Sequence, residues 1–220
     1  MSYWLMMIPA LLLSMWATAK TRSAFKKYSQ VAASSGLTGA EAAERLLASA
    51  GITDVEVTRS QGMLSDHYNP ASKKLALSES VYGSRSIAAV GVACHEAGHA
   101  IQHAKKYPAL GLRTALVPTA SLGSRLAFFV ILGGMFLQAS GLIWAGVILF
   151  SAVVLFQLVT LPVEFDASNR AKKLIVEQGI VYENERVGVD KVLNAAAMTY
   201  VAAAVAGVLQ LLYFVGLARR

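Results

Sequence analysis

The chain has 220 residues, of which 55% are hydrophobic and only 15% are charged, and its formal net charge is +7. Soluble domains carry about 25% charged residues, so this composition argues against an ordinary soluble domain. The basic residues mostly flank apolar runs and form no patch interleaved with aromatic residues, which argues against a nucleic-acid partner. The single cysteine, Cys94, excludes an internal disulfide and a cysteine-based zinc site. The sequence therefore predicts a mainly α-helical membrane protein.

The first apolar run predicts a transmembrane helix at about residues 3–19. It carries no charge, it contains Trp4 and Trp16 near its two ends, and basic residues begin at Lys20. Tryptophan favours the membrane interfaces, and basic residues that follow a span stay in the cytoplasm. Because no positive charge precedes the run, we predict an uncleaved anchor with its N-terminus outside the cell.

Residues 20–113 are polar enough to lie in water, and we expect them to form a small cytoplasmic α+β part. Thr38 and Glu41 have the spacing of a capping box, which begins a helix that we expect to stop near Gly51. Apolar periodicity and turn residues predict the elements that follow. In chain order, these are a strand at 52–58, a turn at 66–70, a strand at 75–77 and a helix at about 84–103.

Three further apolar stretches predict three further transmembrane helices. A single helix over 119–161 would be about 60 Å long, twice the hydrocarbon thickness of a bilayer. We therefore expect two spans that turn near Gln138, followed by a last span close to the C-terminus. The three predicted spans are 119–138, 141–161 and 195–218.

The basic residues set the predicted orientation of these four helices. Segments 20–125 and 162–193 hold 13 and 5 of the 20 lysines and arginines, whereas Arg219 and Arg220 fall on the opposite side. Basic loops stay in the cytoplasm, and the earlier loops usually dominate. We therefore predict that the catalytic segments, about 20–113 and 162–193, face the cytoplasm.

The motif His95-Glu96-Ala97-Gly98-His99 contains the residues that predict a catalytic metal site. A spacing of four puts the His95 and His99 imidazoles on one face of a helix, close enough to share a tetrahedral Zn²⁺. Glu96 lies one step around the helix, where it can accept a proton from a water molecule in the open metal position. Residues 87–101 carry no other charge, and these polar groups would be costly to bury without a partner.

A catalytic zinc normally has three protein ligands, so a third must come from elsewhere. Glu164 is our candidate, because two membrane crossings between His99 and Glu164 return the chain to the same side. His103 continues the four-residue spacing but lies too far along one straight helix to reach the same ion. His67 and Tyr68 are candidate donors to the developing oxyanion, with simple turn packing as the alternative.

Four stretches of the chain resemble the bacterial neutral zinc metallopeptidase family that is often called YugP-like. The resemblance implies a zinc-dependent membrane peptidase of the bacterial inner membrane that acts on a polypeptide substrate. It also implies that His95, His99 and Glu164 are the zinc ligands and that Glu96 is the catalytic base. The matching stretches are SDHYNPASKKLALSESVY (65–82), AAVGVACHEAGHAIQH (88–103), LPVEFDASNRA (161–171) and VLNAAAMTYVAA (192–203).

The chain is also distantly similar to heat-shock and CAAX-type membrane metalloproteases. Those proteins place a membrane hairpin between His-Glu-x-x-His and a Glu-Phe-x-Ala-Asp segment. In this chain Ser168 stands where the similarity implies Asp, and an aspartate occurs instead at Asp166. The carboxylate that orients a zinc-bound histidine is therefore left open: either Asp166 takes this role, or its position simply faces water.

These observations predict a membrane-bound zinc endopeptidase of the gluzincin-like type, with a small zincin-like part in the cytoplasm. We expect its substrates to be membrane or membrane-proximal proteins that pair with the edge of the strand near residues 75–78. An intramembrane protease is disfavoured, because Gln102, His103 and Lys105 end the uncharged part of the motif helix too soon for a span. A non-catalytic zinc-binding scaffold or regulator is the alternative, and the sequence leaves open a homo-oligomer or a regulatory membrane partner.

Overall fold

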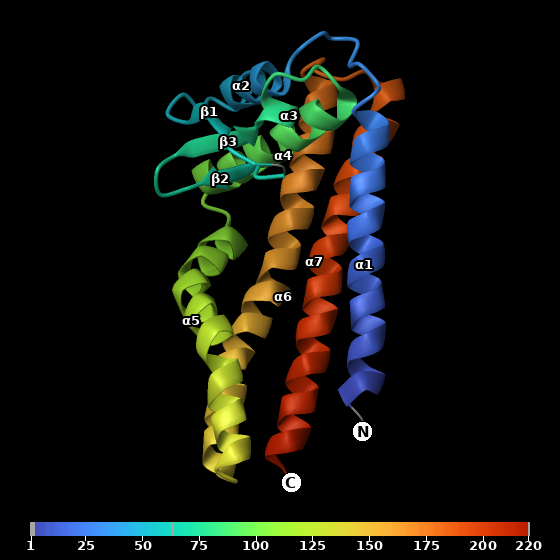
Figure 1. Cartoon of the computed structure of the whole chain (residues 1–220). Helices are drawn as coiled ribbons and strands as arrows, with labels where there is room; N and C mark the ends of the chain where they lie inside the picture. The colour runs from blue at the N-terminus through green and yellow to red at the C-terminus, as the bar shows by residue number, and fades with distance from the viewer. Residues whose placement is uncertain (1–2, 63, 220) are drawn as a thin grey trace. The chain divides into compact units, whose positions relative to one another are not determined.

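The structure is a computed structural model that describes residues 3–62 and 64–219, except for the side chain of Tyr3. The described chain folds mainly into helices, labelled α1 to α7, with a three-stranded sheet (Figure 1). Its residues group into two compact units, each of which is described by itself. The first comprises 3–18, 108–162 and 198–219, and the second comprises 19–107 and 163–197.

The first unit is apolar and is built from parts of four helices. They are α1 (Tyr3–Tyr28), α5 (Pro108–Phe136), α6 (Ser140–Glu177) and α7 (Glu183–Ala218). Of the helices in the described chain, α5, α6 and α7 are long and apolar enough to cross a membrane. The predicted span at 3–19 falls within α1, which is not among them, because Trp4, Pro9 and Ser14 dilute its apolar character.

Glycines allow α5 and α6 to approach closely within this unit. A Cβ atom on Gly146 would lie 2.3 Å from the side chain of Ile131, and one on Gly134 would lie 2.8 Å from the backbone nitrogen of Ile143. Small residues support this kind of close contact between helices in a bilayer. Helix α5 begins at Pro108, earlier than the predicted span, and α6 continues through Pro162 without a break.

The second unit contains the sheet. Strand β1 (Glu56–Ser60) pairs in parallel with β3 (Lys74–Ser78), and β2 (His67–Asn69) pairs with β3 in the antiparallel sense. The strand order is β1-β3-β2, so β3 is the central strand. The prediction that a substrate pairs with the edge of 75–78 is therefore wrong, because both sides of β3 already have partners. Beyond β2, the Asp66 carboxylate accepts hydrogen bonds from the backbone N–H and hydroxyl of Ser78.

Two local predictions about the sheet also needed correction. β1 begins at Glu56, because the N–H of Ile52 still donates to Leu47 at the end of the preceding helix. The predicted turn at 66–70 contains β2, in which Tyr68 packs against the core while His67 and Asn69 are exposed. Short strands with few apolar residues are poorly marked by alternation, which explains both errors.

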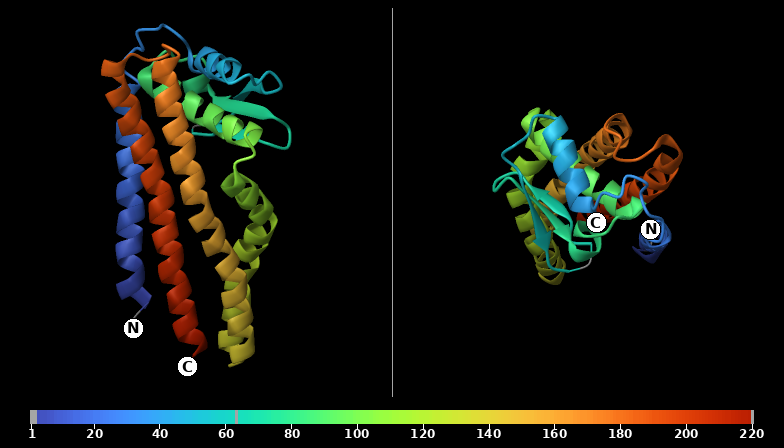
Figure 2. Two further views of the ribbon diagram at one scale, coloured as in Figure 1. Left: turned by 180° about the vertical axis from the view of Figure 1, so that it is seen from behind. Right: turned by 90° about the horizontal axis from the view of Figure 1, so that it is seen from above.

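Three helices complete the second unit: α2 (Gly39–Ser49), α3 (Glu79–Tyr82) and α4 (Ile87–Ala104). The predicted capping box is confirmed, since Thr38 and Glu41 each accept the other's backbone N–H. Helix α4 begins after Ser86, whose hydroxyl accepts the N–H of Ala89. α4 packs against α2, α3, β2 and β3, and the views from behind and from above show it beside the sheet (Figure 2). The core that fixes α4 includes Ala93, Ala97, Ala100, Ile101, Leu46, Leu75 and Leu77.

Candidate metal centre

Helix α4 presents two histidines to one side, as a spacing of four residues requires. The rings of His95 and His99 meet edge to face, with their centroids 4.8 Å apart. The surrounding helix is apolar and buried, so packing of its other faces fixes the direction of both rings. Two nitrogens that could bind a metal ion are thereby held side by side on one helix.

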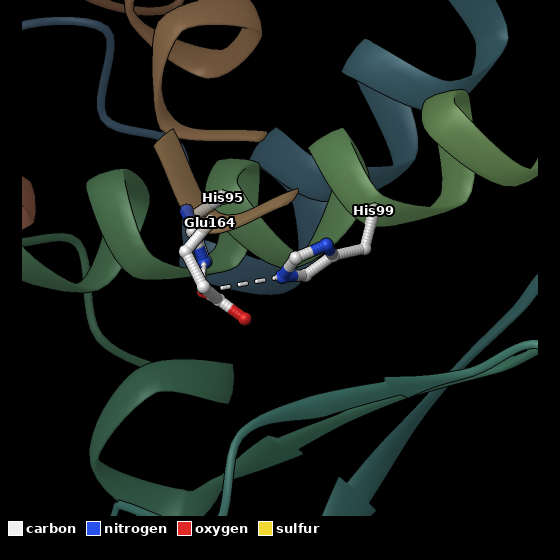
Figure 3. A group of neighbouring side chains, drawn as sticks. All are labelled: His95, His99 and Glu164. Carbon is white, nitrogen blue, oxygen red and sulfur yellow. Dashed lines mark hydrogen bonds and ion pairs between the residues drawn. The ribbon is translucent and has the colours of Figure 1, made fainter. Parts of the chain in front are cut away.

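Glu164 of α6 faces both rings. Its Oε2 atom lies 3.2 Å from Nε2 of His95 and 3.6 Å from Nε2 of His99. Figure 3 shows the carboxylate and the two imidazoles turned toward one another, with the ribbon of α4 behind them. One potential ligand atom from each residue lies within 4.8 Å of the others. Two imidazoles and one carboxylate are a set of donors that could hold a catalytic zinc ion, which normally has three protein ligands.

The side chains of His99 and Glu164 are buried, and that of His95 is partly buried. Their exposed fractions are 13% for His95, 8% for His99 and 3% for Glu164. An ionised carboxylate is costly to bury unless a cation or hydrogen-bond donors compensate it. Burial lowers the pKa of His99, but the neighbouring carboxylates of Glu164 and Glu96 raise it more, so the net shift is upward. A cation beside Glu164 would compensate its buried charge, and a metal ion is one such cation.

The second nitrogen of each ring has its own partner. Nδ1 of His95 lies 3.1 Å from the hydroxyl of Ser168, and Nδ1 of His99 lies 3.0 Å from Oε1 of Gln102. Asp166 touches neither ring in the described contacts, and instead accepts a hydrogen bond from the Gln102 amide at 2.7 Å. Ser168 thus pairs with His95, and Asp166 reaches His99 only through Gln102. In both cases Nε2 is left to face the centre.

Glu96 lies next to the pair. It is 9% exposed, and its charge is close enough to raise the pKa of His99. Among residues 3–62 and 64–219, no hydrogen bond or ion pair to the Glu96 carboxylate is found. A carboxylate in this position can accept a proton from water beside a metal ion.

Gly98 allows α4 and α6 to meet at the centre. A Cβ atom on Gly98 would lie only 2.6 Å from the backbone oxygen of Ala167, which is one turn beyond Glu164 on α6. A side chain here would collide with a backbone atom that cannot rotate away. The glycine in the His-Glu-x-x-His motif therefore sets the distance between the two helices that supply the ligands.

The other predicted site residues lie in other contacts. The hydroxyl of Tyr68 is 2.8 Å from Nδ1 of His103, and burial raises the pKa of Tyr68. His67 is exposed, and its Nδ1 lies 2.8 Å from the backbone oxygen of Ser65. His103 is not part of the group formed by the two histidines and Glu164. The role of His67 or Tyr68 as an oxyanion donor stays a prediction.

Gln102 was not foreseen as part of the centre. Its side chain is completely buried, and it contacts His99, Val163 and Asp166 at once. A signal was present in the sequence, because Gln102 is three residues after His99 and so shares its face of the helix. An amide on the buried side of an apolar helix requires partners.

The chain is similar to known proteins over nearly its whole length. Residues 3–219 match the family described as "Putative neutral zinc metallopeptidase". A relative from Bacillus subtilis (strain 168), described as "Putative membrane protease YugP", is 54% identical over 208 residues, which cover 94% of this chain and 92% of the relative. No solved structure matches the chain.

Proposed function

Since this chain belongs to the family of neutral zinc metallopeptidases, we propose that it is a membrane-bound endopeptidase with Glu96 as its general base. The arrangement of His95, His99 and Glu164, whose ligand atoms lie within 4.8 Å of one another, is the observation that supports this proposal most strongly. The three side chains come from α4 and α6, and Glu96 adjoins them. This set is that of a gluzincin-like site, in which a Glu is the third ligand.

The proposed reaction assigns one task to each residue. His95 and His99, through Nε2, and Glu164, through its carboxylate, would hold the ion. When bound there, Zn²⁺ supplies a Lewis acid that polarises the scissile carbonyl and lowers the pKa of a water molecule to about 7. Glu96 accepts a proton from the attacking water and returns it to the nitrogen of the departing amine. The water oxygen thereby joins the carbonyl carbon, and the C–N bond breaks.

We place the substrate backbone against the outer edge of β2, in place of the edge of β3 that the sequence predicted. β2 lies at one end of the strand order and packs against α4, the helix of the motif. An unpaired strand edge offers backbone groups to an extended peptide. His67 and Tyr68 lie on this strand, so it would bring them to the substrate side.

Membrane and membrane-proximal proteins are the proposed substrates. The apolar helices α5, α6 and α7 and the membrane-protease relative support a membrane location. We propose that α1, whose 26 residues would extend for about 39 Å, adds a fourth crossing. With the basic segments 20–125 and 162–193 inside, the catalytic part would face the cytoplasm of a bacterial cell.

The test compares the purified wild-type protein with Glu96→Gln and with Glu44→Gln, an exposed glutamate of α2 that serves as the control. Zinc content and hydrolysis of labelled casein and of a reconstituted membrane protein are measured. We expect all three proteins to bind zinc, and only Glu96→Gln to lose activity, by about 100-fold or more. Equal activity of wild type and Glu96→Gln would refute the proposed base. Zinc binding by a wild type that hydrolyses neither substrate would favour the scaffold alternative.

A further inference from the structure

Gln102 holds the most constrained contacts around the candidate centre. Its amide nitrogen donates to the backbone oxygen of Val163 at 2.8 Å and to Oδ2 of Asp166 at 2.7 Å. Both of these partners can only accept a hydrogen bond. The amide nitrogen must therefore point toward α6, and the amide oxygen must point toward His99.

This orientation decides which nitrogen of His99 carries a proton. Oε1 of Gln102 lies 3.0 Å from Nδ1 of His99, and an amide oxygen can only accept. Nδ1 of His99 therefore carries a proton, so in the neutral ring the lone pair lies on Nε2. Nε2 is the atom that faces Glu164, at 3.6 Å from Oε2.

Ser168, the partner of His95, does not determine which nitrogen of that ring carries the proton. A serine hydroxyl can donate or accept, so Ser168 is compatible with either tautomer of His95. The amide of Gln102, in contrast, is buried completely and is anchored at both ends. Asp166 is itself fixed, because Nε of Arg170 donates to its Oδ2 at 2.5 Å.

We propose that Gln102 is a positioning residue that locks His99 in its metal-binding tautomer and ties α4 to the segment of α6 that carries Glu164. Val163, whose oxygen it binds, directly precedes Glu164. The side chain of Gln102 thus orients His99 and fixes the position of Glu164. The inference rests on the proposed function only in taking His99 as a metal ligand.

The inference is tested with two substitutions that separate orientation from folding. Gln102→Met fills the space but accepts no proton from Nδ1. Gln102→Glu keeps an acceptor for Nδ1 but loses the donor to Val163 and brings a second carboxyl group next to Asp166. We expect the Glu variant to be the less stable chain in thermal unfolding without metal, yet the better zinc binder.

Zinc affinity is measured by competition with a chelator on protein purified in detergent. Loss of an outer partner of a metal-bound histidine weakens affinity about 10- to 100-fold, which we expect for Gln102→Met. Gln102→Glu should stay within about threefold of wild type on the same argument. If Gln102→Glu instead binds zinc more weakly than Gln102→Met, the zinc affinities follow the order of thermal stability. That result would show that Gln102 only supports the fold.

A second measurement needs no substitution. Nitrogen NMR of the wild-type chain, labelled at its four histidines, reports the protonated nitrogen of each ring. With zinc bound, we expect a proton on Nδ1 of His99 and the metal on Nε2. The reverse assignment would overturn the inference. Failure of the wild type to bind zinc would instead reject the proposed function, so the two failures are distinguishable.

Discussion

Substitution of Gly98 by alanine is expected to open the candidate metal centre. The added Cβ atom would lie 2.6 Å from the backbone oxygen of Ala167, compared with an ordinary contact of about 3.4 Å. Helices α4 and α6 must therefore separate by about 0.8 Å at this point. Metal–ligand distances tolerate changes of only about 0.2 Å, so Glu164 could no longer share an ion with His95 and His99 without distortion.

The expected cost in stability is smaller than the expected cost in metal binding. Overpacking of a well-packed contact costs about 1–3 kcal/mol, and alanine restores up to about 1 kcal/mol of helix propensity relative to glycine. We therefore expect Gly98→Ala to lose about 0–3 kcal/mol in the free energy of unfolding without metal. Zinc affinity should fall by at least about 10-fold, because the ligand geometry is changed directly.

Chelator competition measures this affinity, and thermal unfolding of the metal-free protein measures the stability. Gly91→Ala is a matched control on the same helix, because its Cβ atom would meet only the side chain of Val189, at 3.1 Å. That side chain can adjust, so zinc affinity should be close to that of the wild type. If Gly98→Ala binds zinc as tightly as Gly91→Ala does, the close approach does not control the centre and the reasoning is wrong.

Two further predictions concern the stability of the second unit. Removal of zinc by a chelator should lower the melting temperature, because a ligand present at 100 times its dissociation constant adds about 2.7 kcal/mol to the free energy of unfolding. His95→Ala should abolish the difference between the proteins with and without zinc. An unchanged melting temperature of the wild type would argue against a bound ion. Asp66→Ala should destabilise the chain by about 1–3 kcal/mol, because the carboxylate accepts the N–H and hydroxyl of Ser78 at the end of β3. Chemical unfolding measures the loss, and Asp54→Ala, which removes an exposed ion pair with Lys73, is its control.

Local patterns predicted α2 and α4 of the second unit, but not the short helix α3. The capping box at Thr38 and Glu41 depends only on neighbouring residues, and it occurs as the sequence indicates. The spacing of His95 and His99 likewise fixes one face of a helix whatever the rest of the chain does. The structure also brings Glu164 to this face, although it is 69 residues from His95 in the sequence.

Features that depend on distant partners could not be predicted in the same way. The central position of β3 results from pairing with both β1 and β2, and alternation within a strand does not reveal strand order. The contacts of Gln102 require α6 to pass directly over α4, which no local pattern of α4 shows. Asp166 does not contact His99 directly, because the neutral amide of Gln102 lies between the two.

The burial of Cys94 has a practical consequence for mapping this protein in a membrane. The thiol is inside the core of the second unit, and burial raises its pKa above the usual range. Because the thiolate is the reactive form, the natural chain should resist maleimide reagents while it is folded. Single cysteines introduced into the loops can therefore be labelled from either side of the bilayer without first removing the native one. The orientation of each connection thus becomes accessible in an otherwise unaltered protein.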